Sequence, residues 1–188
     1  MTPWHEEAIT RTPDLSAFTD QDENHTYFLQ KEALRSHNWN ALKTFLALPN
    51  PDGRSVLGFY SLGVTRLEMI APGAEVKDRQ RLGFRLAYLG VDRRLDDLDF
   101  AGQLLLAAGR RCILASAKVG GDLLLITPEA TRTRLLARYG PVPLRDVSGH
   151  LVLPLATIRV ALQEAKDQCM RTRAQLDSQA CRDANGKA

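Results

Sequence analysis

Short apolar runs alternate with segments of helical spacing along this 188-residue chain, and their order predicts an α/β fold. Runs of strand length lie at 42–48, 55–64, 85–91, 123–126 and 150–155. Apolar positions with helical spacing lie at 24–36, 100–118, 127–139 and 157–173. An order of helix, hairpin and then alternating strands and helices predicts a mixed sheet with helices on both faces.

Turn residues separate these segments. Pro49 to Gly53 predicts a tight turn that joins the first two strands into a hairpin, whereas 71–80 reads as a charged loop. Gly120 and Gly121 end the long helix, and Thr127 followed by proline predicts the start of the next one. We therefore expect one domain over 14–158, an irregular lead-in over 1–13, and a helix with a polar, frayed tail over 159–188.

Composition and charge are those of an ordinary soluble protein, with 44% hydrophobic residues and a net charge of +3. No apolar run approaches the length of a membrane span, and no basic leader precedes an apolar stretch, so we expect a cytoplasmic protein. No metal site is expected, because the cysteines and histidines lack ligand spacing. The histidines are expected at the surface or in turns, and they are His5, His25, His37 and His150.

The ordered segments resemble the Gcn5-related N-acetyltransferases, and in particular the branch of bacterial toxin–antitoxin toxins. The resemblance extends over about 14–158 and rests on 43–46, 56–62, 86–94, 129–140 and 152–155. It implies a strongly bent mixed sheet, splayed between two central strands where acetyl-CoA enters, with helices on both faces. It also implies direct attack of a substrate amine on the thioester.

The resemblance places the acetyl-CoA turn after the third apolar strand. The corresponding residues are Leu89, Val91, Asp96, Asp97, Asp99, Ala101 and Gly102. The pattern of the family there is Gln/Arg-x-x-Gly-x-Gly/Ala, whose glycines let backbone amides approach the pyrophosphate. Only Ala101 conforms, and a register shifted to begin at Arg94 still puts carboxylates in the turn.

The three carboxylates in this turn would impair phosphate binding, but they could also serve one of two other roles. They can cap the following helix on a solvated turn, or they can hold Mg²⁺. We favour capping, because acidic loops are usually just solvated.

The sequence offers one candidate for the acid and one for the base of the reaction. In the resemblance, a Phe-Tyr pair four residues before a glycine supplies the proton for the leaving thiolate. This chain has Leu135 and Leu136 there, so Tyr139 is the nearest candidate acid, and Glu68 is a candidate base. Packing for Tyr139 and solvation for Glu68 are the simpler interpretations.

Two functions remain open. The main hypothesis is a non-catalytic or weakly active module with a degenerate acetyl-CoA turn that binds a protein or tRNA. The alternative is an acetyl-CoA-dependent toxin that acetylates the amino group of aminoacyl-tRNA. The resemblance also makes a homodimer a candidate assembly.

Overall fold

The computed structural model describes residues 4–11, 14–49, 53–68, 80–95, 98–130, 136, 138–144 and 149–185. Its sheet has seven strands in the order β1-β2-β3-β4-β5-β7-β6. The strands are β1 (Trp4–Ala8), β2 (Lys43–Pro49), β3 (Gly58–Glu68), β4 (Gln80–Val91), β5 (Leu123–Ile126), β6 (Val142–Pro143) and β7 (Leu151–Pro154). The helices are α1 (Glu23–Tyr27), η1 (Phe28–Glu32), α2 (Ala33–Asn38), α3 (Leu98–Val119), η3 (Pro128–Ala130) and α5 (Leu155–Asn185).

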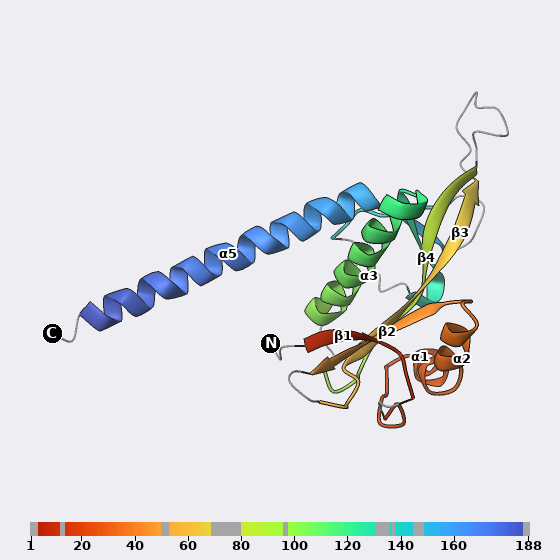
Figure 1. The fold of residues 1–188 in the computed structure, drawn as a ribbon, viewed down its shortest axis with the longest axis horizontal. Coiled ribbons are helices and arrows are strands. Elements are labelled where there is room, and N and C mark those ends of the chain that lie inside the picture. The colour runs from red at the N-terminus through yellow and green to blue at the C-terminus, as the bar shows by residue number, and fades with distance from the viewer. Residues whose placement is uncertain are drawn as a thin grey trace.

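All strand pairs are antiparallel except β4 with β5, so the sheet is mixed, as the sequence predicts. The pair α1 and α2 and the helix α3 lie on opposite sides of the sheet (Figure 1). Each side has its own core. The larger one contains Leu104 and Leu86, both fully buried, and the one under α1 contains Phe59 and Leu46. The predicted α/β class is confirmed.

Four local predictions from the sequence are wrong. The lead-in contains β1, an edge strand whose backbone pairs with β2 and whose Trp4 donates its indole N–H to Gln103 of α3 (2.8 Å). Strand β3 begins at Gly58 rather than at residue 55, and β4 begins at Gln80 rather than at 85. The expected frayed tail is helical, because α5 continues to Asn185 and projects away from the body (Figure 1).

Other predictions hold or lie outside the described residues. Strands β2 and β3 form the predicted hairpin, and α3 and β5 fall within two residues of their predicted bounds. Gly120 and Gly121 adopt positive φ angles (80° and 92°) after α3, a backbone conformation that suits glycine. Of the helix predicted over 127–139, the structure describes η3 at its start and Leu136. Most of the 71–80 loop lies outside the described residues.

A β-bulge in β4 determines which side of the sheet its side chains face near the end of the strand. The register of β3 and β4 shifts between Ser61 and Leu62, so that Ala87 on β4 has no partner on β3. Ala87 and Tyr88 consequently both pack on the α1 side of the sheet, whereas Leu86 and Leu89 pack on the α3 side. The bulge therefore directs the side chain of Tyr88 toward α1. Beyond it, the backbone groups at the end of β4 are free to form hydrogen bonds with elements other than β5.

Candidate functional site

The candidate site is the edge of β4 beyond its pairing with β5. The two strands pair as far as Leu86 and Ile126, and Thr127 then extends the contact with two bonds. The Thr127 amide donates to the Leu86 carbonyl (3.1 Å), and its hydroxyl donates to the Ala87 carbonyl (2.9 Å). Beyond that point β4 continues to Val91, while the chain after Thr127 turns into η3. The two central strands are thus splayed, as the resemblance implies.

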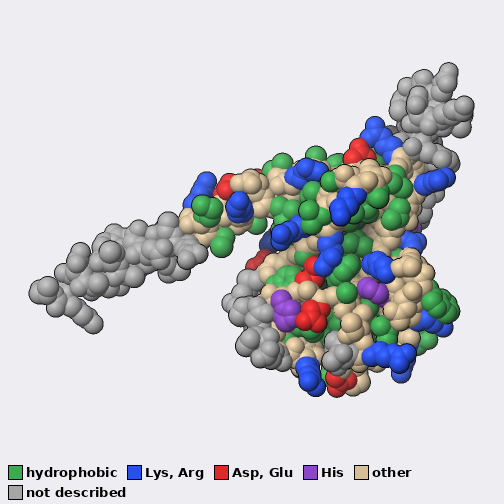
Figure 2. Space-filling model, in the orientation of Figure 1, with side chains coloured by type: hydrophobic (Ala, Val, Ile, Leu, Met, Phe, Trp, Pro, Cys, Tyr) green, Lys and Arg blue, Asp and Glu red, His purple; other side chains and the backbone are tan. Residues whose placement is uncertain are grey.

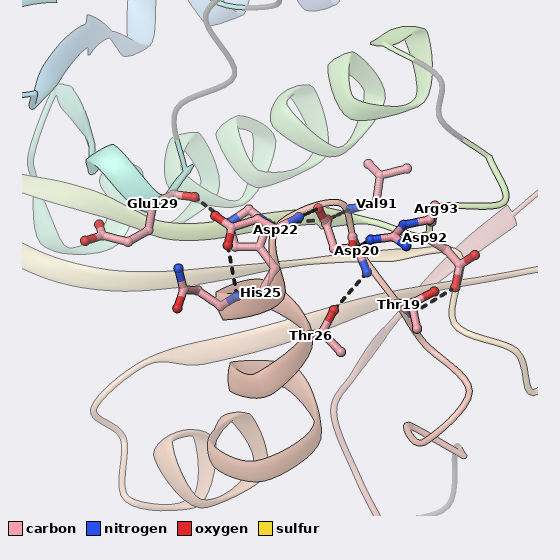
Figure 3. Close-up of polar contacts among 10 residues, drawn as sticks. Thr19, Asp20, Asp22, His25, Thr26, Val91, Asp92, Arg93 and Glu129 are labelled. Carbon is pink, nitrogen blue, oxygen red and sulfur yellow. Dashed lines mark hydrogen bonds and ion pairs between the residues drawn. The ribbon is translucent and has the colours of Figure 1, made fainter.

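A carboxylate from the segment before α1 binds this edge (Figure 3). The amide of Asp92 donates to Leu57 on the β3 side (2.9 Å), so the preceding amide, that of Val91, points toward the splay. There it donates to Oδ2 of Asp20 (2.7 Å). The same carboxylate accepts from the amide of Asp22 (3.0 Å), and Asp20 is 2% exposed. Asp20 therefore supplies the acceptor for a buried strand amide.

His25 of α1 completes a bridge across the splay (Figure 3). Its Nδ1 lies 3.3 Å from Oδ2 of Asp20, and its Nε2 donates to the carbonyl oxygen of Glu129 in η3. The ring is 4% exposed and meets the rings of Phe59 and Tyr88 edge-on. Both ring nitrogens face acceptors, an arrangement that favours the imidazolium form. A surface or turn position for His25 was expected from the sequence, and that expectation is wrong.

The charge of His25 depends on opposing effects. Burial alone lowers the pKa of His25, but the Asp20 carboxylate, the Glu129 carbonyl and Asp22 together raise it above its ordinary value. Nδ1 lies within ion-pair distance of Asp20, and the contact is an ion pair when the imidazole is protonated. His25, between Asp20 and η3, thus holds α1 over the gap between β4 and β5.

This raised pKa predicts how stability depends on pH. A group whose pKa is higher in the folded state stabilises the fold fully below its unfolded pKa, about 6.5, and loses that contribution as pH rises through the folded pKa. Wild type should therefore lose stability relative to His25→Gln as pH rises from 6 to 9. Urea unfolding of both proteins across this range tests the prediction. Parallel stability curves would show that His25 does not change its charge on folding.

The predicted acetyl-CoA turn is only partly described. Leu89 and Val91 are buried on β4, and Asp96 and Asp97 lie outside the described residues. Buried Asp92 accepts from the amide (3.0 Å) and from Nε (2.7 Å) of Arg94, which keeps the pKa of Asp92 low despite its burial. The chain turns sharply at this point, since the Leu95 amide donates to the Asp92 carbonyl (2.9 Å).

At the start of α3 the small residues of the predicted turn are already part of the helix. Ala101 is fully buried in the larger core and Gly102 is buried beside it. Asp99 lies in the first turn, where a negative charge stabilises a helix, and it accepts from Nη1 of Arg138 (3.1 Å). The sequence interpretation of Asp99 as a helix-stabilising residue agrees with this placement, although the role of the turn in cofactor binding remains a prediction.

The candidate acid, Tyr139, and the candidate base, Glu68, lie in different parts of the structure. Tyr139 is half-buried against the larger core and borders a hollow with Thr157 and Val160 of α5. Burial raises the pKa of its hydroxyl, although nearby Arg138 lowers it in part. The backbone of Glu68 pairs with Gln80 at the far end of the hairpin, roughly 35 Å along β4 from Val91. Glu68 is thus far from the open edge of β4, whereas Arg138, the neighbour of Tyr139, contacts Asp99 at the start of α3.

The resemblance places the tyrosine of the family at Leu136, and this leucine is 2% exposed within the larger core. Its neighbour Leu135 lies outside the described residues. An aliphatic side chain there packs and cannot donate a proton.

The described part of the chain contains neither a metal-binding cluster nor a membrane-spanning helix. There, no group of three or more His, Cys, Asp or Glu side chains could hold a metal ion. Among the same residues, no helix is both long and apolar enough to cross a bilayer.

Solved structures with the same architecture belong to toxins of toxin–antitoxin systems, whereas no family model matches the chain. AtaTR bound with acetyl-CoA has a TM-score of 0.72 and 24% identity, covering 85% of this chain and 98% of that one. AtaT complexed with acetyl-methionyl-tRNAfMet has a TM-score of 0.71 and 24% identity, with 85% and 99% coverage. A KacT mutant has a TM-score of 0.71 and 20% identity, with 84% and 98% coverage.

The fold is that of the Gcn5-related N-acetyltransferases. The structural resemblance expected from the sequence is confirmed at the level of the fold, and the similar structures are those of toxins. Similar structures also contain the antitoxin AtaR, and others contain DNA. Sequence reasoning missed Asp20 and His25, because each lies in a polar segment and only the packing of α1 against β4 buries them.

Proposed function

We propose that this protein is a non-catalytic or weakly active member of the acetyltransferase fold class that acts by binding a macromolecule. The observation that carries the proposal is the hydrogen bond from the Val91 amide to Asp20. Acetyl-CoA enters this fold between the central strands, and here the strand edge at that point already has a protein acceptor. A ligand that needs the same amide would first have to displace a buried carboxylate, which is costly.

Two further features support reduced catalysis. The residue at the family position of the acid is Leu136, a core side chain. The start of α3 carries Asp99, a carboxylate of the same sign as a pyrophosphate. Two unit charges about 4 Å apart repel by roughly 1 to 4 kcal/mol near a protein surface. Arg138 offsets part of this repulsion through its contact with Asp99.

The partner that we propose is a protein or a tRNA. Similar structures have been obtained with an antitoxin and with an acetylated methionyl-tRNA. A protein that kept the surfaces with which this fold binds macromolecules, but lost its cofactor site, would still bind such partners.

A second candidate function is a toxin-type acetyltransferase that acts on the amino group of aminoacyl-tRNA. It is favoured by the similar structures, which are toxins solved with acetyl-CoA and with acetyl-methionyl-tRNAfMet. In that case Asp20 must release the Val91 amide when the cofactor binds, and backbone amides rather than glycines must hold the pyrophosphate. Tyr139, whose raised pKa keeps its hydroxyl protonated, is the nearest candidate acid.

Titration of the wild-type protein with acetyl-CoA distinguishes the two functions. We expect no heat of binding and no thermal shift up to about 1 mM acetyl-CoA, whereas a ligand at a hundred times its dissociation constant would stabilise the fold by about 2.7 kcal/mol. Free coenzyme A is the matched control, because it lacks the acetyl group and keeps the pyrophosphate. Micromolar binding accompanied by acetyl transfer to an aminoacyl-tRNA would establish the enzyme instead, and Tyr139→Phe would then test the acid.

A further inference from the structure

The exposed face of α1, η1 and α2 carries a row of aromatic and basic side chains. Tyr27, Lys31, Arg35 and Trp39 follow one another at intervals of four residues, and all four are exposed. Tyr27 is 60% exposed and Trp39 is 74% exposed, which is unusual for rings of this size. Figure 2 shows Lys and Arg side chains over this lower right part of the surface.

The π-helical segment η1 explains why the row stays on one face. Residues four apart drift around a regular α-helix, because one turn takes about 3.6 residues. In η1 the Ala33 amide donates to the Phe28 carbonyl, five residues back, so the turn is wider there. The wider turn offsets part of the drift between Tyr27 and Arg35. Such π segments occur frequently at functional sites.

A hollow of about 240 Å³ lies beside the end of this row. Its walls are Phe28, Glu32, Arg35, Ser36, Trp39, Ala41, Leu42 and Tyr88. The rings of Phe28 and Tyr88 stack with centroids 3.8 Å apart, and the Arg35 guanidinium lies 5.4 Å from the centre of the Trp39 ring. Two flat groups, an exposed indole and a guanidinium, thus border a space that admits an aromatic ring.

A half-buried arginine lies close to the same hollow. Arg85 of β4 points to the α1 side beside Leu42, and among the described residues its buried Nε has no hydrogen-bond partner. Arg35 and Glu32 are the charged residues of the walls, and Lys31 lies four residues before Arg35 along the exposed row. A ligand with a flat aromatic ring and a negatively charged backbone matches this combination of rings and cations.

We propose that this face binds single-stranded RNA, with one unpaired base stacked on Trp39 and the adjacent phosphates paired with Lys31 and Arg35. Unpaired RNA bases are commonly held by aromatic rings and guanidinium planes, while basic side chains follow the backbone. Glu32 is placed to accept from an exocyclic amine of that base. The site lies on α2, and the inference does not require the acetyl-CoA site to be open or closed.

Fluorescence of Trp39 provides a direct test. The chain has two tryptophans, so a Trp4→Phe background leaves Trp39 as the sole indole emitter. Adding an eight-nucleotide single-stranded RNA should quench its emission, since the base stacks on the ring. With labelled RNA and anisotropy, Trp39→Ala should weaken binding roughly tenfold and Trp39→Phe should weaken it less, because a phenyl ring still stacks. Leu114→Ala, an exposed apolar position on α3, is the control for surface truncation and should bind as wild type.

Three results would overturn the inference. Equal quenching by heparin would show that charge alone is recognised, and unchanged affinity in Trp39→Ala would remove the stacking site. Equal binding of the DNA oligonucleotide of the same sequence would exclude selective binding of RNA. Circular dichroism of each variant confirms that it is folded. A failure here leaves the acetyl-CoA titration unaffected, so the two proposals are tested separately.

Discussion

Replacing Asp20 with alanine is expected to lower the free energy of unfolding by about 3–5 kcal/mol at neutral pH. The substitution removes the acceptor of the buried Val91 amide and the ion-pair partner of His25. Both groups stay buried after the change, so they lose their partners without gaining water. Urea unfolding followed by circular dichroism measures the loss.

Asp22 offers a matched control two residues away. Its side chain is 44% exposed and caps α1 by accepting from the Asn24 amide (2.9 Å). Loss of a helix cap costs about 1 kcal/mol, so Asp22→Ala should be clearly milder. If Asp20→Ala destabilises the protein no more than Asp22→Ala, the carboxylate does not hold the β4 edge in the way that the structure indicates.

Truncating Leu136 to alanine is expected to cost about 2–5 kcal/mol of stability. The residue is 2% exposed in the larger core, and its removal leaves a cavity that the surrounding side chains fill only in part. The prediction bears on function, because an acid at this position would have to reach the substrate. Leu114→Ala, at 61% exposure, is the control and should cost less than about 0.5 kcal/mol.

If Leu136→Ala left the free energy of unfolding nearly unchanged, residue 136 would lie at an open cleft. That result would favour the acetyltransferase function. Chemical denaturation of both variants under the same conditions decides between a core and a cleft position.

Much of the fold follows from local patterns. The apolar runs that became β2, β4 and β5 contain the residues of the core, and the glycines after α3 mark its end. Strand β1 was missed because an edge strand exposed to solvent shows little alternation of apolar and polar residues. The full length of α5 was missed because a polar, projecting helix has few apolar positions to reveal its period.

Some features of the candidate site can likewise be predicted from the sequence, and others cannot. The acidic residues after β4 and the leucine at position 136 are visible in the chain, and together they weaken the match to an acetyl-CoA site. Asp20 and His25 carry no local signal, because their burial results from the packing of α1 over the bulged end of β4. The row from Tyr27 to Trp39 is likewise visible as a spacing, but its exposure is known only from the folded helix.

The linear order of apolar runs, glycines and turn residues is sufficient to predict the class of fold, since secondary structure depends largely on near neighbours. The groups that meet at the open edge of β4 are separated by 71 residues in the case of Asp20 and Val91 and by 104 in the case of His25 and Glu129. Such contacts depend on where the sheet bends and on which face each helix covers. The tertiary structure therefore decided that the edge where acetyl-CoA would enter carries a carboxylate and a histidine of the protein itself.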